Sequence, residues 1–279
     1  MKNLMISKPL LLKTIMMVFL FWSSYSFVAQ NYQITYEVKF KPAKESDSLI
    51  KEQMVLKIIK GKSVFYNFNK EKIDSLVQKN NFEATSSITS SLLRLKVFKD
   101  LTKNQNIIGG NFNQFNYWYK DQSPQFKGLK KYGIYKDYTT NEAFTDFGKR
   151  QWHVLYTPDI PINAGPYVFS GLPGLVLKAE SSDGDYSFEV IEIRKINDET
   201  LLTENKENIK KDKLMKNISD FIKDPASHRI NFRNDFGDSF TYEFGGARDA
   251  SYNKTNEIIK KILQDFNNYP DKDIPIITF

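Results

Sequence analysis

The chain has 279 residues, which is enough for one large domain or two small ones with a substantial buried core. Its 26% charged and 41% hydrophobic residues are typical of a globular protein, and its net charge of +7 is not gathered in any arm or segment. We therefore expect no nucleic-acid partner. The chain has no Cys, which excludes disulfides and a lipid-modified cysteine.

The first 30 residues have the order of a secretory signal peptide. Three lysines precede the apolar run 14–22, and the small and polar stretch SSYSFVAQ follows it up to Gln30. The apolar run is shorter than the ~20 residues of a spanning helix, which disfavours the alternative of an uncleaved anchor. We expect cleavage near Ala29 or Gln30, export to the periplasm, the outer-membrane surface or the medium, and no transmembrane segment in the mature chain. Residues 31–279 are expected to form a single β-rich domain.

Aromatic residues make up 14% of the chain, and in its first half they occur in short strand patterns. The stretch YQITYEVKF alternates from Tyr32 to Phe40 and predicts a half-buried antiparallel strand. The stretch EQMVLKIIKGKSVFYNF predicts a hairpin around Gly61. Further strands are expected at 115–120 and 132–138, whereas 73–103 fits either helix or strand.

A second hairpin is predicted around Asp183 and Gly184, a dipeptide that favours tight turns. On its return strand the apolar alternation changes phase between Val190 and Ile191. One extra residue in the ladder, a β-bulge, would account for that change.

Helical periodicity appears late in the sequence. One apolar stripe runs over 209–222, and the other runs over 258–266 with Asn253 or Thr255 as its N-cap. A short strand pair, HRINF and SFTYEF, lies between them. The predicted fold class is therefore α+β, with a mostly antiparallel β meander, as a curved sheet or half-barrel, on which the two amphipathic helices pack.

The segment Gly171-Leu172-Pro173-Gly174 precedes a predicted strand. A phosphate-binding loop is disfavoured because a strand follows it in place of a helix and Pro173 lacks an N–H donor. The segment instead predicts a type II turn, in which Gly174 takes a positive φ and Gly171 allows a close approach of other atoms.

Catalytic and metal sites find little support in the sequence. Ser170 lacks the flanking glycines of a nucleophile elbow, and His153 and His228 have no recognisable partner pattern. Asp183 and Asp185 lack the rest of a calcium loop, so their turn is expected to be structural. We expect no catalytic residue, no metal site and no cofactor.

The stretch from Arg150 to Ile193 resembles the signature region of the GLPGLI family, a group of uncharacterised secreted proteins of Bacteroidetes. The matching positions are Trp152, Tyr156, Pro158, Pro161, Gly165, Pro166, Gly171, Leu172, Pro173, Gly174 and Leu175. The sequence departs from the family pattern at 153–155 and lacks the upstream cysteine that is often present. The resemblance implies export and a shared fold, with these positions as structural or binding residues, and it transfers no activity.

The expected function is that of a non-enzymatic envelope protein. The aromatic-rich antiparallel pattern suggests a sheet that binds an apolar small molecule or an envelope protein partner. A secreted hydrolase is an alternative that would require polar and titratable residues to meet in one cleft. An outer-membrane β-barrel is another, suggested by the terminal Phe279 and disfavoured by the two amphipathic helices.

Overall fold

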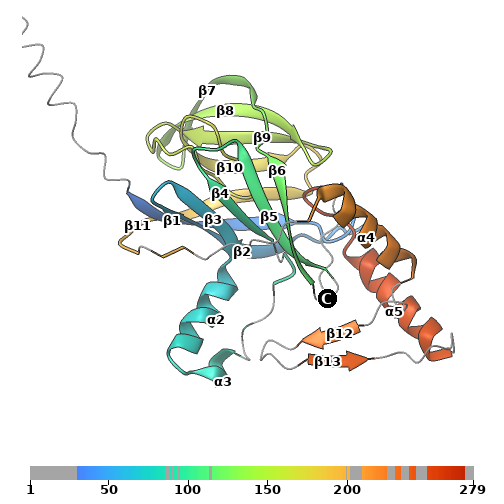
Figure 1. Ribbon diagram of the computed structural model, residues 1–279. Coiled ribbons are helices and arrows are strands. Elements are labelled where there is room, and N and C mark those ends of the chain that lie inside the picture. The colour runs from blue at the N-terminus through green and yellow to red at the C-terminus, as the bar shows by residue number, and fades with distance from the viewer. Residues whose placement is uncertain are drawn as a thin grey trace, which may run out of the picture. The chain divides into compact units, whose positions relative to one another are not determined.

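The computed structural model (Figure 1) describes most of the chain after the predicted signal peptide. The described residues are 30–85, 88, 91–93, 95–112, 115–198, 200–201, 209–224, 230–233, 239–242 and 250–273. The chain from Asn31 onward forms one unit. The predicted signal peptide up to Ala29 lies outside the described residues, as does His228, for which no role was predicted.

An antiparallel sheet of eleven strands dominates the described structure. Its strands are β1 (Asn31–Phe40), β2 (Ile50–Ile59), β3 (Lys62–Asn67), β4 (Lys96–Asp100), β5 (Gln105–Phe112), β6 (Phe115–Gln122), β7 (Lys127–Tyr135), β8 (Tyr138–Phe147), β9 (Arg150–Thr157), β10 (Leu175–Ser181) and β11 (Tyr186–Ile196). A separate two-stranded sheet pairs β12 (Ile230–Arg233) with β13 (Ser239–Tyr242). The helices are α2 (Phe68–Gln78), α3 (Phe82–Thr85), α4 (Lys211–Lys223) and α5 (Ala250–Asp265).

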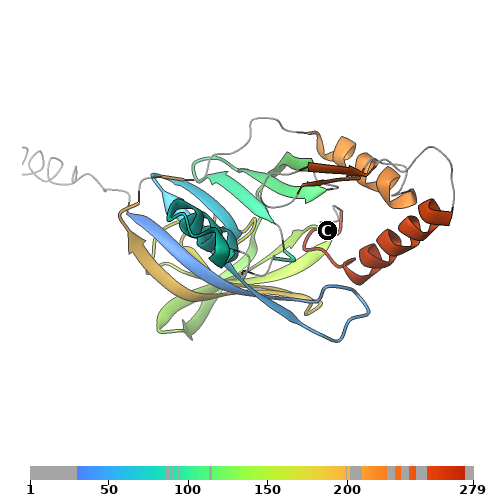
Figure 2. The same ribbon diagram turned by 90° about the horizontal axis from the view of Figure 1, so that it is seen from below.

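The large sheet consists of two meanders, β1 to β6 and β7 to β11, which are joined where β1 pairs with β11. The sheet is strongly curved and open, with β6 and β7 as its two edges (Figures 1 and 2). The prediction of a mostly antiparallel curved sheet is confirmed. The described chain is mostly β, with few and short helices, so the helical part of the predicted α+β class is minor.

The main core lies on one face of this sheet and draws on all of its strands except the edge strand β7. Phe65, Tyr36, Trp152 and Phe188 are among its fully buried members. A smaller cluster on β2 to β6 contains Val55, Val64, Tyr66, Phe98 and Trp118. Because Phe98 follows Val97 of the main core along β4, and side chains alternate along a strand, the second cluster lies on the opposite face.

β1 is confirmed as a strand, but it is not half-buried as its alternation predicts. Gln33 and Thr35, on the polar side of the pattern, are almost as buried as Ile34 and Tyr36. β1 is a central strand between β2 and β11, and Gln33 lines a groove together with Phe68 and Leu76 of α2, which lies over this face. The sequence pattern records only the face that packs against the main core.

Both predicted hairpins are confirmed. Lys60 and Gly61 join β2 to β3 with φ values of 49° and 75°, as two-residue hairpin turns require. The second hairpin is formed by β10 and β11, where Ala179 pairs with Phe188. On its return strand β11, Glu192 pairs with Thr35 of β1 and Val190 pairs with Tyr36. Ile191 is therefore the extra residue of a β-bulge, which confirms the predicted change of phase.

Two local predictions are wrong. Residues 132–138 are not one strand, because β7 ends at Tyr135 and a turn at Lys136 and Asp137, both with positive φ, leads into β8. Asn253 and Thr255 do not cap the last helix, because α5 begins at Ala250, about two turns before its apolar stripe. The ambiguous stretch 73–103 divides into most of α2, then α3 and β4.

The two late helices are present, but their predicted packing on the sheet is not confirmed. α4 contacts the edge strand β6, and its buried residues Leu214, Ile218 and Phe221 belong to the main core. The end of α4 contacts α5, since Asn256 Nδ2 donates a hydrogen bond to Asp224 Oδ1 at 3.0 Å. The described contacts therefore place α4 against an edge of the sheet.

Candidate functional site

The Gly-Leu-Pro-Gly segment ends the long connection between β9 and β10. Gly174 N donates to Leu172 O at 2.8 Å, whereas Leu175 N donates to Ile160 O at 3.0 Å. A hydrogen bond between residues two apart defines a γ-turn with Pro173 at its centre. The predicted type II turn is therefore wrong in type, because Leu175 pairs with a more distant part of the chain.

The two glycines of this turn have different roles from those predicted. Gly171 has φ +100° and an added Cβ would meet nothing within 4 Å, so its backbone conformation alone requires glycine. Gly174 has φ +156°, and an added Cβ would lie 2.1 Å from Thr157 O and 2.6 Å from Thr157 C. The positive φ predicted for Gly174 is confirmed, and the close approach assigned to Gly171 occurs at Gly174.

The residues of the family-like pattern divide into a buried and an exposed set. The buried ones are Trp152, Tyr156, Gly165, Pro166, Leu172, Gly174 and Leu175. The exposed ones are Pro158, Pro161, Gly171 and Pro173. Trp152 contacts Phe169 edge to face at 4.9 Å between ring centroids, and its indole nitrogen donates to Phe147 O at 3.1 Å. The structure thus places the buried set in the packed core, and a binding role for these positions stays a prediction.

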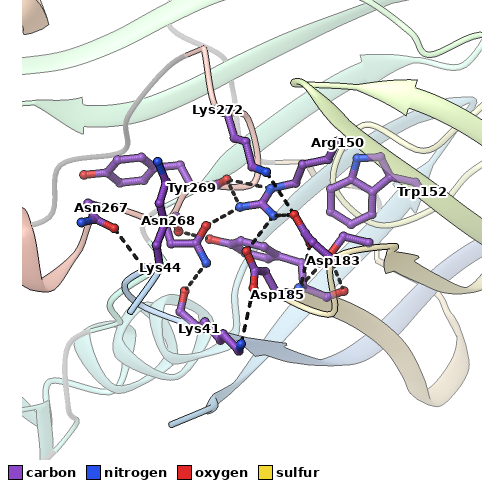
Figure 3. A network of polar contacts seen from close by, with 12 residues as sticks. Lys41, Lys44, Arg150, Trp152, Asp183, Asp185, Asn267, Asn268, Tyr269 and Lys272 are labelled. Atoms are coloured by element: carbon purple, nitrogen blue, oxygen red, sulfur yellow. Dashed lines mark hydrogen bonds and ion pairs between the residues drawn. The ribbon is translucent and has the colours of Figure 1, made fainter. Parts of the chain in front are cut away.

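The densest polar network of the site surrounds Arg150, the first residue of β9 (Figure 3). Its side chain is fully buried and ion-paired with Asp183 and Asp185, which lie in the turn between β10 and β11. Arg150 also donates to the Asn268 side chain and, from Nε at 3.1 Å, to Tyr269 O. A second bond from Nη2 reaches Tyr269 O at 3.0 Å.

These contacts occupy all five N–H donors of the guanidinium group, so Arg150 has none left for a ligand. The network is built from four separate parts of the chain, namely Lys41, Arg150, the turn 183–185 and the segment 268–272. Lys41 O accepts from Asn268, and Lys272 Nζ lies 3.1 Å from Asp183 Oδ2. Arg150 therefore fixes the segment around Asn268 across the ends of β1, β9 and β11.

The pKa shifts of the groups around Arg150 agree with its role in holding the segment around Asn268. Burial raises the pKa of the Asp183 carboxyl, but hydrogen bonds from Ser181 and Lys272 and the charge of Arg150 outweigh it, so the net pKa is lowered. Burial raises the pKa of Tyr186, whose hydroxyl donates to Asn268 O at 2.7 Å. The turn at Asp183 supplies a counter-charge for Arg150, whose role no sequence pattern indicated.

His153 has a partner that the sequence did not reveal. Its Nε2 lies 2.7 Å from Glu142 Oε2, and its ring stacks on Phe144 at 4.9 Å between centroids. A hydrogen bond from Lys130 is the largest of the causes that lower the pKa of Glu142, and His153 adds to it. Among the described contacts, none joins His153 to Ser170 or to another serine. The pair is formed across β8 and β9, so no local sequence pattern could have indicated it.

An open groove lies beside α2. It has a volume of about 520 Å³ and is lined by Phe68, Leu76 and Ile88 together with Gln33, Lys72, Ser75 and Arg194. In the part of the chain that is described, no three His, Cys, Asp or Glu side chains gather as a metal ion would need. Every described helix is too short or too polar to span a bilayer.

An exposed apolar surface lies at the opposite edge of the sheet from α4. It comprises Leu129, Tyr132 and Ile134 on β7 and Phe144 on β8, and we refer to these four residues as the β7–β8 patch. Their exposed fractions are 50%, 51%, 72% and 39%. Tyr132 and Phe144 both contact His153, so these two share one face of the sheet. Ile134 pairs with Thr139, five positions from Phe144 along β8, so its side chain points to the other face of the same edge.

The two edges of the sheet differ in how they are covered. At β6, Ile209 N donates to Trp118 O at 2.8 Å, and α4 contacts the same strand. At β7, no described segment other than β8 forms a backbone hydrogen bond with the strand. The unpaired backbone of β7 and the β7–β8 patch are therefore both accessible.

Comparison with known proteins gives little beyond a family of unknown function. Residues 136–178 match the model of a family described as "Protein of unknown function (Porph_ging)". No curated protein matches the sequence. Two solved structures of PNGF-II, in space groups C2 and P21, are similar at 18% identity, with TM-scores of 0.42 and 0.43.

The alignments with PNGF-II cover 61% and 65% of this chain, and 28% and 31% of the PNGF-II chains. The chain therefore spans less than a third of the proteins that it matches, and the likeness establishes neither fold nor function. The matched segment 136–178 includes β9 and the Gly-Leu-Pro-Gly turn. Over that segment the chain is similar to a family of unknown function.

Proposed function

We propose that this protein is an exported, non-enzymatic envelope protein of the GLPGLI type, and that it binds a protein partner through the β7–β8 patch. The observation that carries the proposal is the uncovered edge at β7, where three large apolar side chains are at least half exposed. Apolar groups gathered on a surface favour contact with another molecule. We also propose that both late helices pack on the sheet, as the sequence predicts.

The charges near the patch favour a partner with acidic side chains. β7 carries Lys127, Lys130 and Lys131 and no acidic residue. The first two form ion pairs with Asp146 and Glu142 that remain largely exposed on the lysine side, at 66% and 68%. We infer that the partner presents an apolar side chain flanked by carboxylates, which would complement these lysines.

Pairing of a partner's β-strand with the edge strand β7 is less favourable than contact through the side chains of β7. The pairing of β7 with β8 shifts register twice, between Lys127 and Lys130 and between Lys131 and Gly133. Irregularities of this kind twist an edge strand and hinder continuous pairing with another strand. The patch therefore offers side chains as its main contacts.

Chemical cross-linking of the protein purified from its native cells tests whether a protein partner contacts the β7–β8 patch. Cross-links are expected to map to β7, and the same partner should be lost on Tyr132→Ser and Leu129→Ser. Leu49→Ser is a matched control, because Leu49 is also 50% exposed and lies outside the patch. All three variants should melt like the wild type. Equal retention of the partner by all variants, or recovery of an apolar small molecule in its place, would refute the proposal.

Export is tested independently of binding. The order of basic, apolar and small residues in 1–30 supports cleavage near Gln30. N-terminal sequencing of the protein from the envelope fraction should begin close to Gln30 or Asn31. An intact Met1 in that fraction would indicate an anchor.

A further inference from the structure

Three buried polar atoms lie in one row across neighbouring strands and lack a hydrogen-bond partner. The four such side-chain atoms found in the described residues are Ser63 Oγ, Lys99 Nζ, Asn106 Oδ1 and Trp118 Nε1. Ser63 pairs with Lys99 between β3 and β4, and Lys99 pairs with Asn106 between β4 and β5. Directly opposite residues point to the same face, with Cβ atoms about 5 Å apart.

This row lies on the face of the main core. Val97 and Ile108, two residues from Lys99 and Asn106, belong to the main core, whereas Phe98 belongs to the cluster on the other face. Ser63, Lys99 and Asn106 are 2%, 5% and 0% exposed. The three side chains are thus enclosed on the face of the sheet that carries the main core.

Burying a lysine side chain at such a position is unfavourable for the free energy of folding. Burial lowers the pKa of Lys99 well below its usual range, because the charged ammonium loses its hydration. A Met side chain of similar length would avoid that cost. Buried polar groups without a partner in a native protein call for a bound water, an ion or a ligand.

The chemistry of the three groups defines what would fit. A protonated lysine has three N–H donors and a serine has one O–H donor. Asn106 Nδ2 is directed toward Gln122 O at 3.4 Å, and Asn106 Oδ1 and Lys99 Nζ make no hydrogen bond with each other. The donors of Lys99 and the hydroxyl of Ser63 therefore remain for an acceptor that carries negative charge.

We propose that Ser63, Lys99 and Asn106 form an internal site for a small carboxylate. The two carboxylate oxygens match donors on two residues, and the single negative charge matches the charge of Lys99. Asp121, which pairs with Asn106 in the same row, already forms an ion pair with Lys211 Nζ at 2.7 Å. A phosphate or sulfate, with more oxygens and up to two charges, would keep most of its oxygens unpaired in this apolar surrounding. The site is separate from the β7–β8 patch and does not depend on the proposed partner.

Binding should be accompanied by proton uptake. In the absence of a ligand the buried amine favours its neutral form, and a bound carboxylate favours the ammonium form. Affinity for the carboxylate should therefore fall as the pH rises. Calorimetry in two buffers with different ionisation enthalpies would measure this proton uptake.

Sodium formate is the probe for the site, with sodium chloride at equal ionic strength as its reference. The melting temperature of the wild type should rise saturably with formate and not with chloride. Lys99→Met should remove the response to formate while melting no lower than the wild type in chloride. Lys103→Met, at a 70% exposed lysine side chain, should keep the response.

Ser63→Ala should weaken formate binding by about tenfold, as expected for the loss of one hydrogen bond to a charged group. An equal response to formate and chloride, or a formate response that persists in Lys99→Met, would overturn the proposal. A crystal structure obtained in formate that contains only water between the three side chains would overturn it as well.

Discussion

At the scale of single residues, Gly174 is the position of the Gly-Leu-Pro-Gly segment with the least room. We expect Gly174→Ala to lower the free energy of unfolding by about 2–4 kcal/mol, because overpacking and backbone strain each cost ~1–3 kcal/mol. The added methyl group would collide with the backbone of Thr157, which is fixed in β9. Urea denaturation of the variant and the wild type measures the difference.

Gly171→Ala is the matched control for that change. Only its φ of +100° opposes alanine, since the space around it is open. The expected loss is about 1–2 kcal/mol. If the two variants lost equal stability, the close approach at Gly174 would not be what requires glycine there.

Asp183 gives a second residue-scale prediction, on pH dependence. Its folded pKa is lowered below the ordinary value of 3.8 by hydrogen bonds and the charge of Arg150, which outweigh burial. A carboxyl with a lowered folded pKa stabilises the protein above its unfolded pKa, and this contribution is lost as the pH falls through the folded pKa. We expect the stability difference between the wild type and Asp183→Asn to shrink as the pH falls below 3.8. Denaturation curves at a series of acidic pH values test this, and a constant difference would contradict it.

At the scale of secondary-structure elements, the β-bulge at Ile191 allows a deletion test. The residues on either side of the bulge already pair with adjacent residues of β1, namely Val190 with Tyr36 and Glu192 with Thr35. Deleting Ile191, which is 48% exposed, would keep every other pair and every buried face. We expect the deletion variant to fold with a thermal melt close to that of the wild type.

Deletion of Ser187 is the control. It would move Tyr186 by one position and turn this buried ring, whose hydroxyl donates to Asn268 O, toward the other face. We expect that variant to lose its cooperative melt. A severe loss on deletion of Ile191 would mean that the bulge itself, and the twist that it adds, is needed for the curvature of the sheet.

At the scale of the whole molecule, Arg150 connects parts of the chain that are more than 100 residues apart, since Asn268 lies 118 positions away. We expect Arg150→Met to lower the free energy of unfolding by about 3–5 kcal/mol, the cost of removing one partner from a buried ion pair. Asp183, Asp185 and Asn268 would all lose their shared partner (Figure 3). Chemical denaturation measures the loss.

Lys127→Met removes an exposed ion pair with Asp146 and should cost only about 0–1 kcal/mol. If Arg150→Met cost no more than that, the network would not hold the segment around Asn268 in place. Faster limited proteolysis near that segment in Arg150→Met alone would support the assignment independently.

The local features of this protein were determined by the sequence itself. Alternation marked β1, the dipeptides at Gly61 and Gly184 marked their hairpins, and the change of phase at Val190 marked the bulge. Each of these signals arises within a few residues, where backbone sterics and the two-residue period of a strand decide the outcome. The late helices were also found from their period, although the start of α5 was not, because a helix extends beyond its apolar stripe.

The tertiary structure alone decided which side chains meet. The pairs of His153 with Glu142, Arg150 with Asp183, and Lys99 with Asn106 depend on register between strands or on the path of a distant segment. The sequence placed a type II turn at Pro173, but the hydrogen bond that would close it goes from Leu175 to Ile160. A single sequence records the preference of each residue for its own backbone and face, and the contacts that bury a charge or leave an edge uncovered depend on the whole sheet.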